Sequence, residues 1–217
     1  MKTTALVACT LSLALAGCFG PGDPVEIPED ITKAAQTCFA AQSLALRADA
    51  GDDEPVTFSQ YSETIQYPLI AAAKVEPFTV QTALTALESL EPVMDKVAAL
   101  DYEGAVPKCE ARFGISGAEG DPTLPESDAQ AVMSCLAMAG FMAGGVREEG
   151  ENFAEKVGIY EALVARLSER MKTDVDILTA MIDGDGEALV NEGLKQAFAE
   201  GDPEGYLAKC EARFPAK

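Results

Sequence analysis

The stretch Lys108-Cys109-Glu110-Ala111-Arg112-Phe113 decides how this chain is organised, because the same six residues return near the C-terminus at 209–214. The match begins further upstream, where Asp101-Tyr102-Glu103-Gly104 aligns with Asp202-Pro203-Glu204-Gly205, so that 9 of 14 aligned positions are identical. A match of this length, centred on a cysteine, indicates an internal duplication. The sequence therefore predicts two copies of one structural unit.

Two further cysteines extend the duplication to the start of each unit. Cys38 lies 97 residues before Cys135, and Cys109 lies 101 residues before Cys210, so the units differ by a four-residue insertion. Between them, a segment rich in glycine and proline has the composition of a linker. The sequence predicts unit 1, the linker and unit 2 over residues 30–117, 118–126 and 127–217.

The fold class that the sequence predicts is all-α, since apolar residues recur every three or four positions in both units. The clearest helix is in unit 2, where the recurring positions are Phe153, Val157, Tyr160, Val164, Leu167 and Met171. Thr57 and Gln60 have the spacing of a capping box, which marks a helix start. Gly144-Gly145 are expected to end the first helix of unit 2.

The N-terminus indicates export. Met1-Lys2 is a short positive start, and Thr3 to Ala16 is an almost unbroken run of apolar or small residues. That run is too short to span a membrane, which takes about 20 apolar residues, but it has the form of the central region of a signal peptide. It ends in Leu15-Ala16-Gly17-Cys18, which resembles the lipobox of bacterial lipoprotein precursors.

This resemblance covers residues 1–18 and implies removal of a signal peptide, residues 1–17, with lipidation of Cys18. Two or three acyl chains hold a protein firmly to a bilayer, whereas one binds only marginally. By similarity to enterobacterial lipoproteins, Phe19 in place of Asp implies the outer membrane, with the folded part on the periplasmic face. Residues 18–29 contain three prolines and two glycines, which predict an extended tether. A plain signal peptide cleaved elsewhere is the alternative.

Four cysteines remain in the exported chain beside Cys18. An even number in an oxidising compartment predicts disulfides. If the units fold alike, the first and last helices of each should meet, which pairs Cys38 with Cys109 and Cys135 with Cys210. The alternative joins the units to each other, through one bridge between their first helices and one between their last helices.

The balance of charge excludes one class of partner. The chain has 16 Lys+Arg against 36 Asp+Glu, a net charge of −20, and removal of Lys2 with the signal peptide leaves −21. Such a surface repels the phosphate backbone, so we expect no nucleic acid. Solubility is the ordinary reason for such a net charge. Binding of a cationic partner is the more specific alternative.

Each copy of the repeated stretch also carries a lysine and an arginine one helical turn apart. These are Lys108 with Arg112, and Lys209 with Arg213. Basic residues in a last helical turn offset the carbonyl end of the helix dipole and pair with nearby acids, which is the role predicted here. The alternative is contact with an anion or a partner.

The chain has no histidine, which removes Ser-His-Asp and Cys-His catalysis and most catalytic metal sites. It also lacks a CxxC pair and a glycine-rich nucleotide loop. The acidic turn from Asp183 to Glu187 lacks the glycine and glutamate positions of an EF-hand. We therefore expect no catalytic residue, no metal and no cofactor.

The functional prediction is a non-catalytic binding or scaffolding module of the envelope, whose partner is an envelope protein or a cationic molecule. The alternative is a carboxylate-dependent cell-wall hydrolase, since Glu88-Ser89 and Glu126-Ser127 resemble the Glu-Ser pair of lytic transglycosylases. The methionine-rich helix with Met133, Met138 and Met142 is predicted to be core. Its alternative is an apolar ligand groove, which would form an elongated cavity along that helix.

Overall fold

The computed structural model describes residues 22–50, 55–88, 90–115, 121–148, 151–173, 175–183 and 186–216. Helices dominate these residues, and the described part of the chain contains no β-strand. The fold is therefore all-α, as predicted.

The helices of the two units correspond in order. Unit 1 contains α1 (Ile31–Ala50), α2 (Phe58–Ala73), α3 (Val80–Glu88), α4 (Glu91–Ala98) and, after a short 3₁₀ turn at Glu103–Ala105, α5 (Val106–Phe113). Unit 2 contains α6 (Asp128–Glu148), α7 (Ala154–Thr173), α8 (Val175–Asp183), α9 (Gly186–Ala199) and α10 (Pro203–Arg213), with a 3₁₀ turn at Glu151–Phe153. The repeated stretch forms the last helix of each unit.

Each unit is closed by a disulfide between its first and last helices. Cys38 of α1 is bonded to Cys109 of α5, with their Cα atoms 5.5 Å apart, and Cys135 of α6 to Cys210 of α10, with 5.7 Å between Cα atoms. All four cysteines are fully buried. The pairing within units is confirmed.

The Asp-x-Glu-Gly segment ahead of each closing cysteine also repeats its local structure. The Asp101 carboxylate accepts a hydrogen bond from the Gly104 amide at 3.0 Å, and Asp202 accepts one from Gly205 at 2.9 Å. A Cβ built on either glycine would overlap the aspartate carboxylate. The same aspartate–glycine contact therefore precedes each closing cysteine, and a larger residue at the glycine would require the aspartate side chain to shift.

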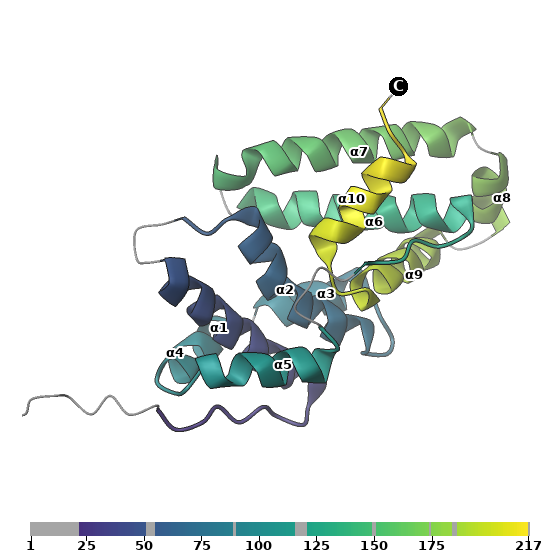
Figure 1. The fold of residues 1–217 in the computed structure, drawn as a ribbon. Coiled ribbons are helices and arrows are strands. Elements are labelled where there is room, and N and C mark those ends of the chain that lie inside the picture. The colour runs from purple at the N-terminus through teal and green to yellow at the C-terminus, as the bar shows by residue number, and fades with distance from the viewer. Residues whose placement is uncertain are drawn as a thin grey trace, which may run out of the picture.

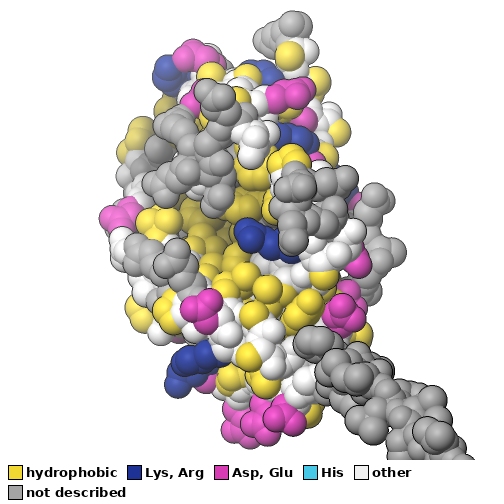
Figure 2. All heavy atoms as spheres, turned by 90° about the vertical axis from the view of Figure 1, so that its left-hand side faces the viewer, with side chains coloured by type: hydrophobic (Ala, Val, Ile, Leu, Met, Phe, Trp, Pro, Cys, Tyr) yellow, Lys and Arg dark blue, Asp and Glu magenta, His cyan; other side chains and the backbone are white. Residues whose placement is uncertain are grey.

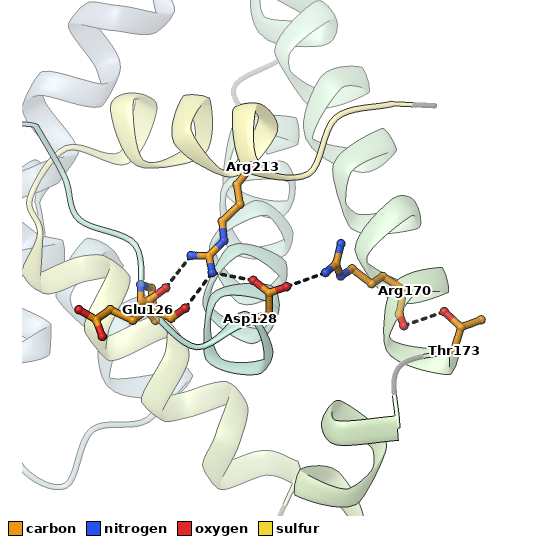
Figure 3. Close-up of polar contacts among 6 residues, drawn as sticks. Glu126, Asp128, Arg170, Thr173 and Arg213 are labelled. Carbon is orange, nitrogen blue, oxygen red and sulfur yellow. Dashed lines mark hydrogen bonds and ion pairs between the residues drawn. The ribbon is translucent and has the colours of Figure 1, made fainter.

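The repeated arginine joins the last helix to the chain just before the first helix. Arg112 donates to the Glu29 carbonyl at 2.6 Å, and Arg213 donates to the Glu126 carbonyl at 2.9 Å. Figure 3 shows Arg213 between Glu126 and Asp128, and its guanidinium pairs with the Asp128 carboxylate at 2.6 Å. The predicted pairing with a nearby acid is present for Arg213, but the feature common to both repeats is the carbonyl contact.

Helix boundaries follow the sequence with one exception. Asp30 caps α1 by accepting from the Lys33 amide at 2.9 Å, and the capping box of Thr57 with Gln60 is confirmed at the start of α2. The expected stop at residues 144–145 is wrong, because α6 continues to Glu148. Buried side chains on the same turns, such as Met142, hold this part of α6 in the core and outweigh the low helix propensity of glycine.

The two units are packed against each other rather than strung in a line. In Figure 1, α2 and α3 lie between the α1–α4–α5 group and the helices of unit 2. Phe78, just before α3, packs edge-on against Phe198 of α9 at 5.9 Å between ring centroids, and the Val80 amide donates to the Asn191 side chain. The largest buried apolar cluster contains residues of both units. One shared core therefore joins α2 and α3 to unit 2.

The predicted tether is extended, but its described part lies against unit 1. The Asp101 amide donates to the Asp23 carbonyl at 2.9 Å, where Pro24 and Asp101 form an isolated parallel bridge. Val25 is only 4% exposed and packs in a small cluster with α1 and α4 residues. From Gly22 onward the chain is thus part of the folded body instead of a free spacer. The cleavage site and Cys18 lie outside the described residues.

Among the helices that the structure describes, none is both long enough and apolar enough to cross a bilayer.

Candidate functional site

Helix α8 presents apolar side chains to solvent on one face. Val175 is 72% exposed, Leu178 36% and Ile182 80%, and their spacing of three and four residues places them together along the helix. Ile177, on the other side of α8, is buried. Elsewhere in the described ranges the one exposed large hydrophobic residue is Leu84, at 40%. Three exposed apolar side chains on one helix of so acidic a chain make this face the candidate site.

A cavity of about 120 Å³ lies on the buried side of α8, between α6, α8 and α9. Its lining residues are Ala129, Gln130, Met133, Ile177, Leu189, Glu192, Gly193 and Gln196. Gln130 and Glu192 are exposed, so the cavity reaches the surface. Its walls are mainly apolar, and its volume is close to the roughly 150 Å³ of a cavity that holds a benzene ring. It can therefore accept one apolar side chain.

Gly193, one of the residues that line the cavity, lies where α9 packs closely on α6. A Cβ at Gly193 would lie 3.0 Å from the backbone of Ser134, so glycine permits the approach of the two helices. The Ser134 hydroxyl is buried and accepts a hydrogen bond from the Tyr206 hydroxyl at 2.8 Å. Burial raises the pKa of Tyr206, which keeps its hydroxyl protonated as a donor. Gly193 thus belongs both to the lining of the cavity and to the close contact between α9 and α6.

The three methionines of α6 are buried, as predicted for core residues, with Met133 at 6% exposure. Met138 and Met142 are buried in the core, as expected for gap-filling residues. Met133 lines the cavity. The alternative, an elongated groove along this helix, differs from the small cavity that Ala129, Gln130 and Met133 line at the N-terminal end of α6.

The acidic residues give little support to the hydrolase alternative. Burial, and secondly the negative charge of Glu204, raise the pKa of Glu63, but Glu63 is exposed on α2. Glu204 pairs with Lys156 at 2.6 Å, and neither acid lines the cavity. Of the predicted Glu-Ser pairs, Glu126 is exposed on the linker, and Ser89 lies outside the described residues.

A metal site is also not evident where the structure can be described, since no three histidine, cysteine, aspartate or glutamate side chains gather there. Within the acidic turn, Gly184 and Asp185 lie outside the described residues.

A second apolar region lies on the side of the molecule that faces the viewer in Figure 2, away from α8. Hydrophobic side chains gather there around a hollow, with acidic and basic groups near its edges. At this end of the fold, the starts of α2 and α7 bring Phe58 and Phe153 edge to face at 5.8 Å, and Lys156 lies over the Phe58 ring at 5.0 Å. All residues that line the cavity between α6, α8 and α9 belong to the described part of the chain.

Periodicity alone did not identify the α8 surface, because apolar residues recur with the same spacing whether a helix face is buried or exposed. In the sequence, this helix belongs to a stretch with five acids (Asp174, Asp176, Asp183, Asp185 and Glu187) and no lysine or arginine from 174 to 187. A core helix does not require such a concentration of one charge. Comparison with protein families, with curated proteins and with solved structures finds no match, so the chemistry of this surface is the guide to its function.

Proposed function

We propose that this chain is an envelope lipoprotein, anchored through Cys18 to the periplasmic face of the outer membrane, which acts as a non-catalytic binding module. The binding site in this proposal is the α8 surface, defined as the exposed residues Val175, Leu178 and Ile182.

The observation that carries the proposal is the exposure of Val175, Leu178 and Ile182 along one face of α8. Leaving large apolar side chains in water costs free energy that burial would recover, at roughly 25 cal/mol per Å². A second protein that covered this face would recover it. Two disulfides and a shared core supply a rigid support, which reduces the entropy lost on binding.

Crosslinking in intact cells tests the binding role. A photoreactive amino acid at position 182 should give a discrete adduct, because this side chain projects into solvent from the α8 surface. The matched control places the same group at Ala162, an exposed position on α7. The same adducts from both positions, or none from position 182, would contradict the assignment.

Two further measurements test the anchor and the non-catalytic role. Radioactive palmitate should label the protein, and Cys18→Ala should abolish the label; persistent labelling would refute the anchor. The unlipidated chain should release no muropeptides from purified cell wall, and release would establish the hydrolase alternative instead.

A further inference from the structure

We propose that the cavity between α6, α8 and α9 binds a small primary amine that carries one benzene-sized apolar group. In this assignment the apolar group fills the cavity, and the ammonium group lies at its mouth near the carboxylate of Glu192. The site is separate from the exposed face of α8, so the inference goes beyond the proposed function and does not rest on it.

The walls of the cavity select the apolar part of the ligand. Met133 of α6, Ile177 of α8 and Leu189 of α9 line it, and Met133 and Ile177 are buried. A volume of about 120 Å³ suits one aromatic ring or one short branched alkyl group, since an apolar cavity of roughly 150 Å³ binds benzene. An empty apolar cavity lacks packing contacts, and a ligand that fills it recovers them.

Contacts around the cavity hold it open before any ligand binds. Leu189, Gly193 and Gln196 are spaced by four and three residues, so they share one face of α9. That face approaches the backbone of α6 closely at Gly193, and the disulfide between Cys135 and Cys210 joins α6 to α10. A site that needs little rearrangement loses less entropy when a ligand binds.

The mouth of the cavity selects the polar end of the ligand. Gln130 and Glu192 are exposed and Gln196 is half-buried, so the polar residues of the lining lie on the solvent side. Each of them offers an oxygen acceptor, and Glu192 is the only charged residue of the lining. An ammonium group donates hydrogen bonds to such acceptors and complements the carboxylate of Glu192, whereas a carboxylate on the ligand would be repelled.

Basic residues close to the mouth pair with other acids. Lys195, three residues after Glu192 on α9, forms an ion pair with Glu76. The pKa of Lys195 is raised mainly by its hydrogen bond to Glu76, and the charge of Glu192 makes the smallest contribution. On the α6 side, the arginines of α7 and α10 pair with Asp128, two residues before Gln130. These pairings leave the negative charge of Glu192 to act at the mouth.

Three ligands that share a phenyl ring and differ in the polar end test the proposal: benzylamine, benzyl alcohol and benzoate. The protein is the chain from residue 18 carrying Cys18→Ala, with both disulfides formed and the methionine methyl groups labelled with carbon-13 for NMR. Met133 lines the cavity and reports its occupancy, whereas Met138 and Met142 are buried in the core and serve as internal references. Met133→Leu assigns the reporter signal.

We expect benzylamine to shift the Met133 signal until it saturates, and benzoate to bind at least about tenfold more weakly, with benzyl alcohol between them. Glu192→Gln removes the charge and keeps the size of the side chain. It should weaken benzylamine by about fivefold at low ionic strength and leave benzyl alcohol within about twofold. The matched control Glu155→Gln removes the same charge from the end of α7 that is far from α8, and should change neither affinity beyond about twofold. Both glutamates are exposed, so these variants should fold.

Ala129→Leu tests whether the phenyl ring occupies the cavity, because the larger side chain should fill part of it. We expect this variant to weaken benzylamine and benzyl alcohol by about tenfold, while circular dichroism shows an unchanged helix content. Unchanged affinity for both ligands would overturn the assignment of the cavity. Should this variant fail to fold, the Met133 signal and the Glu192→Gln variant still decide the matter.

Three other outcomes would overturn the inference. They are a Met133 signal that benzylamine does not shift, equal binding of benzylamine and benzoate, and equal effects of Glu192→Gln and Glu155→Gln. A shift of all methionine signals together, without saturation, would mean non-specific contact and would overturn it as well. Crosslinking from position 182 is measured on the exposed face of α8, so failure of the amine site would leave the proposed binding function standing.

Discussion

Arg112 and Arg213 occupy the same position in the two repeats, and both donate a hydrogen bond to the backbone carbonyl two residues before the first helix of their own unit. The disulfide of each unit ties the same last helix to the middle of the same first helix. The repeated stretch is therefore a closure device with two attachments. Its cysteine provides the covalent attachment and its arginine provides the polar one.

Removing the arginine should destabilise unit 2 more than unit 1. Arg213 donates to the carbonyls of Pro125 and Glu126 and pairs with Asp128, whereas Arg112 makes one such carbonyl contact and is exposed. Hydrogen bonds from charged groups contribute about 1.5–3 kcal/mol when shielded and less in solvent. We expect about 1–2 kcal/mol for Arg213→Ala and below about 1 kcal/mol for Arg112→Ala, measured by urea unfolding under oxidising conditions.

The matched control for this prediction is Arg47→Ala, which removes an exposed arginine from the last turn of α1. It changes net charge by the same amount and should cost less than Arg213→Ala. Equal destabilisation by Arg47→Ala and Arg213→Ala would mean that the effect arises from charge alone.

Substitution of the repeated glycine should cost stability through the cap that it permits. A Cβ at Gly205 would overlap the Asp202 carboxylate that caps α10. Gly205→Ala should therefore destabilise by about 1 kcal/mol, the usual cost of a lost cap. In the background of Asp202→Ala the same change should cost much less, because no cap remains to be displaced. Unfolding free energies of the four proteins give this cycle.

Gly158→Ala provides the matched control for the glycine prediction. Gly158 lies in α7 with open space around the position of a Cβ. Alanine there should stabilise the protein by about 0.5–1 kcal/mol, since glycine is a poor helix former. A stabilising Gly205→Ala would contradict the proposed role of the repeated glycine.

Local patterns in the sequence predict the helices and, through the duplication, the disulfides. A period of three to four residues predicts helix wherever it is sustained. If the two units fold alike, each joins its own first and last helices, which predicts Cys38–Cys109 in unit 1 and Cys135–Cys210 in unit 2. Cap residues such as Asp30 act within one turn, so their role is also local.

Such local patterns do not predict contacts between segments that are distant in the sequence. Arg112 contacts a carbonyl 83 residues away, and the burial of Val25 depends on the surface of unit 1. Insertion of α2 and α3 into a shared core likewise depends on how the units dock. The exposed face of α8 also depends on tertiary packing, because periodicity does not distinguish a face that contacts the core from one that contacts solvent.

The shared core predicts that the two units unfold together. Cys38→Ala with Cys109→Ala should destabilise by about 2–5 kcal/mol, the usual cost of a lost native disulfide. The residues joined are 71 apart in one bridge and 75 in the other, so removing the Cys135–Cys210 bridge should cost nearly the same. Hydrogen exchange followed by mass spectrometry should show protection lost together in α1–α5 and α6–α10. Early exchange of the first group alone would indicate independent units.

Acid should weaken the closure of unit 2 through Asp128. The hydrogen bond from Arg213 lowers the pKa of Asp128 most. Burial opposes it as the second-largest effect, and the charge of Arg213 and the contact with Arg170 add smaller lowering effects. A carboxylate whose pKa is lower in the folded state stabilises that state above its unfolded pKa. This contribution is lost as pH falls through the folded pKa, below the ordinary value of 3.8.

Asp128→Asn should therefore lower the free energy of unfolding near pH 7, by less than about 1 kcal/mol because the carboxylate is half exposed. The difference from the wild-type protein should shrink between about pH 5 and pH 2 as Asp128 takes up its proton. In the Arg213→Ala background the same substitution should show a weaker pH dependence, because the main cause of the lowered pKa is gone. A difference that stays constant from pH 7 to pH 2 would show that the contact between Asp128 and Arg213 does not depend on the charge of the carboxylate.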